Sequence, residues 1–220
     1  MQASRLELAD LAGAIAGAEP DLDPTQQRIA IAVYRLLADG MPVAPEEAAA
    51  VAGVPLPQVA ALLDRWPGVF RDSEGGVVGF WGLTIAELTP THRIEVDERA
   101  LYGWCAWDTL FLPGILERPG RVTSTCPTTR EVIELVVGPD GVVRSSHPQA
   151  VVSFLLPEGG FEADVIQRFC HFVHFFATRE AGETWVAEHP ATFLLSLEEA
   201  FELGALVNRR QFPTALGGPR

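Results

Sequence analysis

The chain has 220 residues, of which 16 are basic and 29 acidic, so its formal net charge is −13 at pH 7. A hydrophobic content of 48% with 20% charged residues is typical of a folded globular protein and excludes a disordered or fibrous one. The acidic balance argues against nucleic acid as the main partner, because cationic side chains supply most of the affinity for phosphates. No apolar run is long enough to span a membrane, and the N-terminus lacks the basic cluster of a signal peptide, so we expect a cytoplasmic protein.

The first third of the chain predicts three helices and a hairpin, at residues 23–40, 45–52, 57–66 and 69–80. The first helix begins with Asp23, Pro24 and Gln26, which provide an N-cap, a proline at the first helical position and the partner of a capping box. The hairpin has a glycine-rich turn. This order of elements is that of a winged helix-turn-helix, and it defines a region over residues 25–82 that follows an N-terminal extension over residues 1–24.

A winged helix-turn-helix often binds DNA, but the charges of this one do not favour that function. The helix that would enter the groove has Arg65 beside Asp64, and the hairpin tip places Asp72 and Glu74 against Arg71. A groove reader needs base-edge donors and cations that face the phosphates. We therefore expect this region to be structural or to cover a site.

Residues 83–220 change to the pattern of an antiparallel sheet with flanking helices. Strands are expected at residues 92–97, which alternate between polar and apolar residues, and at 132–137 and 142–143, which flank a hairpin turn. Further strands are expected at 151–156 and 169–177, which are rich in valine and phenylalanine. Helices are expected at residues 101–112, ended by Pro113, and at 196–208, which opens with a capping box at Ser196 and Glu199. The predicted fold class is α+β, a winged-helix-like region of three helices and a hairpin followed by an antiparallel-sheet core with flanking helices.

Several common catalytic motifs are missing from the sequence. It has no Gly-rich phosphate loop, no lysine to complete a Walker motif, and no GxSxG nucleophile elbow. Three cysteines do not make a disulfide scaffold. The candidate chemistry therefore lies with the cysteines, the histidines and the acidic residues.

Cys105 and Asp108 are three residues apart, so a helix or a tight turn places them on one face. Trp104, Trp107 and Phe111 flank them with apolar groups. Desolvation there would raise the pKa of Asp108, so that this carboxyl would hold a proton near neutrality. The alternative is a buried cysteine that acts as a small hydrophobe beside an aspartate that caps a turn.

Cys170 lies in the run Phe-Cys-His-Phe-Val-His that begins at Phe169. In a strand, Cys170 and His174 would share one face and His171 would point to the other. This leaves open a zinc site or a Cys–His–Asp hydrolase, although the chain has no CxxC or HxxxH pair and no local oxyanion hole. Cys126 has no acid or histidine beside it, and we expect it to be structural.

Two of these segments resemble the organomercurial lyase (alkylmercury lyase) family. One runs from Gly82 to Leu110 and contains Trp-Cys-x-x-Asp, and the other is Phe-Cys at Phe169 followed by Val-His-Phe-Phe. The N-terminal helices and hairpin, and the helix that ends near Asn208, are also similar to the family. The resemblance covers about residues 25–210 and implies protonolysis of a carbon–mercury bond, which gives a hydrocarbon and Hg(II).

The resemblance also implies a role for individual residues. It implies that Cys105 and Cys170 are the two mercury-binding thiolates and that Asp108 is the proton donor and a third group at the mercury site. The residues support this, because mercury is soft and prefers sulfur. The aromatic neighbours Trp104 and Phe169 are expected to line the substrate pocket, where they would accommodate an alkyl or aryl group.

Cys126 corresponds to a cysteine usually regarded as structural, and His171 stands where some members have a second cysteine. No organic cofactor is expected, but thiols are needed for turnover, and small thiols or a mercuric reductase would accept Hg(II). Two alternatives stay open. One is a winged-helix metal-sensing regulator that uses the same cysteines and histidines, and the other is a homologue that binds mercury without cleaving the bond.

Overall fold

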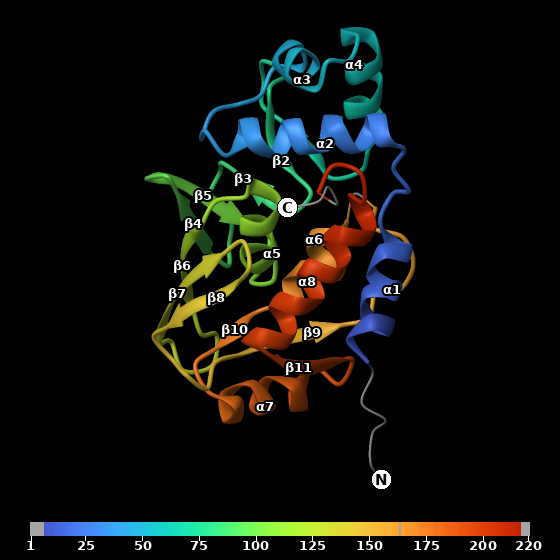
Figure 1. Cartoon of the computed structure of the whole chain (residues 1–220). Coiled ribbons are helices and arrows are strands. Elements are labelled where there is room, and N and C mark those ends of the chain that lie inside the picture. The colour runs from blue at the N-terminus through green and yellow to red at the C-terminus, as the bar shows by residue number, and fades with distance from the viewer. Residues whose placement is uncertain (1–6, 163, 217–220) are drawn as a thin grey trace.

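The structure, a computed structural model, describes residues 7–162 and 164–216 of the chain. Its helices, labelled in Figure 1, are α1 (Leu8–Ala18), α2 (Pro24–Leu37), α3 (Pro45–Ala52), α4 (Leu56–Arg65), α5 (Asp108–Leu116), α6 (Val165–Arg168), α7 (Arg179–Glu188) and α8 (Leu197–Gln211). The strands of the larger sheet are β1 (Val69–Arg71), β2 (Val77–Phe80), β3 (Leu83–Thr84), β4 (His92–Val96), β5 (Arg99–Gly103), β6 (Gly120–Thr125), β7 (Val132–Gly138) and β8 (Gly141–Ser145). The strands of the smaller sheet are β9 (Val151–Leu155), β10 (Phe175–Phe176) and β11 (Thr192–Ser196).

Helices α2, α3 and α4 and the hairpin β1–β2 lie at one end of the molecule (Figure 1), in the predicted order. Asp23 forms the predicted capping box, because its carboxylate accepts hydrogen bonds from the backbone N–H groups of Thr25 and Gln26 at 2.7 and 2.9 Å. The buried face of α2 includes Ile29 and Val33. The α+β fold class is confirmed.

The hairpin of the N-terminal region is continuous with the larger sheet of the core. Strand order in that sheet is β1-β2-β3-β5-β4-β6-β7-β8, and every neighbouring pair is antiparallel. Strand β2 pairs with β3 through Phe80 and Leu83, both of which are fully buried. The division of the chain at residues 24 and 82 stays a prediction.

The smaller sheet has the order β10-β9-β11, and its central strand β9 is buried along its whole length. Helix α8 packs against α1 and α5 (Figure 1). It begins with the predicted capping box, in which Ser196 and Glu199 exchange hydrogen bonds of 2.9 and 3.1 Å. The indole N–H of Trp107 donates to the carbonyl of Ala200 at 2.9 Å, which fixes the start of α5 against α8.

The prediction of a helix over residues 101–112 is wrong in its first half. Asp97 and Glu98 both have positive φ, 46° and 64°, and form a two-residue turn that pairs β5 with β4. The helix begins only after β5 and then continues through Pro113, which we expected to end it. The proline removes one backbone donor, but Leu112 beside it is fully buried, and this burial favours the longer helix.

The prediction of one strand over residues 169–177 is also wrong. A 3-10 turn occupies Cys170–Phe172, and β10 contains only Phe175–Phe176. Between them, the Ser153 hydroxyl accepts a hydrogen bond from the backbone N–H of His174 at 3.0 Å. The buried Ser153 side chain thus satisfies a backbone N–H group that would pair with the neighbouring strand if this segment were a continuous strand.

None of the helices in the described part of the chain has the length and apolar character that crossing a membrane requires.

Candidate active site

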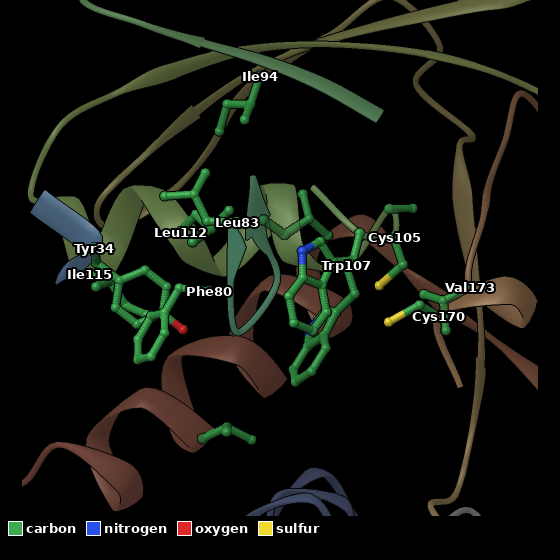
Figure 2. Packing of buried hydrophobic residues seen from close by; sticks show 14 of the residues in the cluster. Tyr34, Phe80, Leu83, Ile94, Cys105, Trp107, Leu112, Ile115, Cys170 and Val173 are labelled. Atoms are coloured by element: carbon green, nitrogen blue, oxygen red, sulfur yellow. The ribbon is translucent and has the colours of Figure 1, made fainter. Parts of the chain in front are cut away.

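The structure brings Cys105, Asp108 and Cys170 together. Their ligand atoms, two sulfurs and a carboxylate oxygen, all lie within 4.8 Å of one another. All three residues are buried, with exposed fractions of 5% or less. Figure 2 shows the sulfur atoms of Cys105 and Cys170 facing each other beside Trp107.

Each of the three groups comes from a different local structure. Cys105 lies in the turn between β5 and α5, Asp108 is the first residue of α5, and Cys170 begins the 3-10 turn. The backbone N–H of Ala106 donates to the carbonyl of Val173 at 3.1 Å, which ties the two cysteine-bearing segments to each other. This link between distant segments places the two thiols side by side.

The Asp108 carboxylate lies between the backbone of Cys105 and that of Gly82. The backbone N–H of Cys105 donates to its Oδ2 at 2.6 Å. On the other side, a Cβ atom added to Gly82 would lie 2.6 Å from its Oδ1, and Gly82 has a φ of +91°. Position 82 therefore requires glycine both for its backbone conformation and for the space that the carboxylate occupies.

The cluster favours neutral groups before a substrate binds. Burial raises the pKa of Asp108 to about 7, against the lowering effect of the hydrogen bonds from Cys105. Burial, the hydrogen bond with Cys170 and the nearby Asp108 carboxylate all raise the pKa of Cys105 well above that of a free thiol. The hydrogen bond with Cys105 lowers the pKa of Cys170, but burial and Asp108 outweigh it, so this pKa is raised as well. Two soft thiols beside a carboxyl that can carry a proton suit a soft metal whose bound group must be protonated.

A cavity of about 70 Å³ opens onto this cluster. Trp104 and Phe169, the two residues expected to line the substrate pocket, both contribute to its wall. The aromatic residues around it are Tyr34, Trp81, Trp104, Trp107, Phe111, Phe161 and Phe169. Such a wall excludes water and accommodates an apolar group.

The residues that line this cavity without having been predicted to do so include Glu19, Tyr34 and Gly82. Glu19 belongs to the extension to which no function was assigned, and it follows α1 directly. The apolar spacing of Leu11 and Ile15 in that extension is a helix signal that would have indicated a folded segment. Without tertiary structure, no pattern connects Gly82 with Asp108.

Cys126 and the histidines lie outside the cluster. Cys126 is fully buried, does not line the cavity, and accepts a hydrogen bond on its sulfur from the backbone N–H of Thr129 at 3.4 Å. Burial raises the pKa of Cys126, but the hydrogen bonds from Thr129, Ala177 and Thr128 lower it by more. The resulting pKa is below that of a free thiol. Among the described residues, no histidine belongs to a group that could hold a metal ion, so neither the zinc site nor the Cys–His–Asp hydrolase gains support.

Comparisons with known proteins agree with these observations. The family model of alkylmercury lyase matches residues 86–208, and that of the helix-turn-helix domain of alkylmercury lyase matches residues 9–81. The alkylmercury lyase of Staphylococcus epidermidis is 42% identical over 179 residues, which cover 81% of this chain and 80% of that protein. The alkylmercury lyase of Pseudomonas putida is 38% identical over 177 residues, which cover 80% of this chain and 81% of that protein.

A solved structure has the same fold. The crystal structure of the mercury-bound form of MerB2 superposes with a TM-score of 0.71 at 23% identity, and the match covers 94% of this chain and 100% of that one. The sequence matches extend over both the winged-helix region and the sheet core. The chain therefore belongs to the alkylmercury lyase family.

Proposed function

We propose that this protein cleaves the carbon–mercury bond of alkyl- and arylmercury compounds by protonolysis, with Cys105 and Cys170 as the mercury ligands and Asp108 as the proton donor. The observation that carries the proposal is the group of two thiols and one carboxyl within 4.8 Å, buried at the wall of an aromatic cavity. Trp104 and Phe169 would hold the organic group.

The chemistry balances without a change of oxidation state. The Cys105 sulfur displaces the ligand that accompanies the organomercury cation, and the thiol proton leaves with that ligand. The Cys170 sulfur then binds mercury, and its proton replaces the one that Asp108 delivers to the carbon. The electron pair of the carbon–mercury bond forms the new C–H bond, so the products are a hydrocarbon and Hg(II) held by two thiolates.

Release of the product requires other thiols, because Hg(II) bound to two sulfurs leaves only by exchange onto further sulfur ligands. Small thiols or a mercuric reductase would serve as acceptors in the cytoplasm. No organic cofactor takes part in these steps, since thiols and one carboxyl supply both the ligands and the proton. Cys126, away from the cavity, would support the fold.

Nucleic acid is not a partner in this proposal, although the N-terminal region has a helix-turn-helix fold. Arg71 of the hairpin forms an ion pair of 2.8 Å with Asp64 of α4, so its charge is already neutralised within the protein. The hairpin tip adds Asp72 and Glu74, which repel phosphates.

The test is headspace detection of benzene or methane after incubation of the purified protein with phenylmercury or methylmercury and excess thiol. Catalytic release of the hydrocarbon, lost in Cys105→Ser, is the expected result. Stoichiometric mercury binding without hydrocarbon would overturn the proposal and favour a sequestering protein. Salt-sensitive DNA binding by that inactive protein would then identify a regulator.

A further inference from the structure

Glu19 is a half-buried residue whose carboxyl lies at the reaction cavity and is not used by the proposed chemistry. It follows the last residue of α1, and its backbone N–H donates to Ile15 at 3.2 Å. The carbonyl of Ala18 accepts a hydrogen bond of 2.7 Å from the backbone N–H of Phe161, which fixes the end of α1 to the loop before α6. Both contacts hold the Glu19 side chain at the cavity wall.

The carboxyl of Glu19 has an unused hydrogen-bonding atom. Its Oε2 is sealed from solvent and has no hydrogen-bond partner among the described residues. The hydroxyl of Tyr34, which lines the same cavity, is already engaged, because it donates its proton to the carbonyl of Trp81 at 2.7 Å. A buried polar atom without a partner is unfavourable for folding, and this one lies where a ligand would bind.

The position of Glu19 determines which part of a substrate it can touch. It does not belong to the group formed by Cys105, Asp108 and Cys170, so it is not a ligand to mercury held there. Burial raises the pKa of the Tyr34 hydroxyl, and the charges of Glu19 and Asp108 each raise it further. Tyr34 therefore lies near both carboxyls. If mercury were held by the two thiols and Asp108, Glu19, as a separate residue of the cavity wall, would be placed to contact the organic group instead of the metal.

We propose that Glu19 is a specificity-determining residue of the cavity, an inference that rests on the proposed function. Glu19 favours organic groups that carry a hydrogen-bond donor or a cation, and it disfavours those that carry an anion. A donor on the organic group would satisfy Oε2, whereas an anion would be brought into a cavity that also holds the carboxyls of Asp108 and Glu162 and that has no cationic side chain among its described lining residues.

The selectivity against anions is expected to depend on pH. Burial raises the pKa of Glu19 to about 8, so the carboxyl is neutral at pH 7 and ionised at pH 9. The other titratable groups that line the cavity are Tyr34, Asp108, Glu162 and Cys170. On the neighbouring helix α8, the guanidinium of Arg210 lies against Gly13 of α1, nearly two turns before Glu19 along the chain.

The experiment compares three arylmercury substrates that differ only at the para position. These are phenylmercury, 4-carboxyphenylmercury and 4-aminophenylmercury, and kcat/KM for each is measured with excess thiol from pH 6.5 to 9. The ionisation of Asp108 and of the thiols changes kcat/KM for both substrates by the same factor, because both substrates need those groups equally. This factor cancels in the ratio of kcat/KM for the carboxyl compound to that for phenylmercury. In the wild type we expect this ratio to fall about tenfold between pH 7 and 9, an amount typical of unfavourable charge pairs in partly buried sites.

In Glu19→Gln the same ratio should stay constant with pH, while Asp21→Asn, an exposed acid two residues away, should behave as the wild type. Glu19→Ala, which removes the acceptor, should lower the preference for the amino compound over phenylmercury by about fivefold, the value of one hydrogen bond.

Several outcomes would overturn the inference. One is a ratio that depends on pH equally in the wild type and in Glu19→Gln, and another is an unchanged amino preference in Glu19→Ala. Failure of the wild type to release benzene from phenylmercury would instead refute the proposed function. These results are distinguishable because the first two require an active enzyme.

Discussion

The backbone N–H of Cys105 and the Oδ2 atom of Asp108 form a hydrogen bond of 2.6 Å across the turn that opens α5. The bond fixes the carboxylate beside the sulfur of the same residue that donates to it. A thiol and an acid are thereby held in one rigid turn, to which the distant Cys170 adds the second sulfur.

Serine substitutions should separate the roles of the three cysteines. Cys105→Ser and Cys170→Ser should each reduce hydrocarbon release by about 10³-fold or more, because a hard hydroxyl is a poor ligand for mercury. Cys126→Ser should stay active but unfold more easily, by about 1–3 kcal/mol, since it places a hydroxyl in a fully buried position. The assays are benzene release and urea unfolding; an inactive Cys126→Ser that keeps wild-type stability would contradict this division.

Replacing Asp108 should affect protonation of the carbon more than binding of mercury. Asp108→Asn should bind one equivalent of Hg(II) but cleave phenylmercury about 10²–10⁴-fold more slowly, the range for loss of a positioned acid. In the wild type, single-turnover cleavage should decline as pH rises above about 7, because the pKa of Asp108 is about 7 and only the protonated form donates. Full activity of Asp108→Asn would remove this residue from the mechanism.

The same carboxyl should reduce the stability of the protein at high pH. Because the pKa of Asp108 is raised from 3.8 to about 7 by folding, the folded state binds the proton more tightly and stability is lost as pH rises through that interval. Asp108→Asn lacks this loss, so its Tm should exceed that of the wild type at pH 8 and should differ little at pH 4. A lower Tm at pH 8 would show that the ionised carboxylate is stabilised by contacts stronger than the cost of burial.

Two buried histidines should make the fold sensitive to acid. Burial and the charge of His174 lower the pKa of His92 from 6.5 to about 3, and burial lowers that of His174 to about 4. Both must be neutral in the folded protein, so stability is present above pH 6.5 and falls below it, by about 1.4 kcal/mol per pH unit for each histidine. His92→Asn should flatten the decline of Tm between pH 6.5 and 4, and the control His147→Asn, at a more accessible histidine, should leave it unchanged.

Adding one methyl group at Gly82 should displace the acid. In Gly82→Ala the new Cβ would meet Oδ1 of Asp108 at 2.6 Å, so we expect cleavage to fall at least tenfold and stability to fall by about 1–3 kcal/mol. Gly75→Ala is the matched control, because Gly75 also has positive φ but has open space around its Cβ position. Equal activity of the two variants would show that the carboxylate can move without loss of function.

Local sequence patterns determined much of the fold. The capping boxes at Asp23 and Ser196 and the hairpin turn of the wing depend on hydrogen bonds within a few residues, so they could be identified from the chain alone. The proximity of Cys105 and Asp108 has the same origin, because their spacing of three residues places them in one turn. The resemblance of these segments to a known family supplied the reaction.

Only the tertiary structure decided what surrounds that turn. Cys170 lies on a 3-10 turn, where its phenylalanine-rich sequence predicted a strand, and hydrogen bonds with Ser153 of β9 hold the end of that turn and the residues after it. Gly82 reaches the cavity from the turn between β2 and β3, and Glu19 reaches it from the end of α1. Contacts between such distant segments depend on how sheets and helices bury their apolar faces together, and this packing has no periodicity in the sequence.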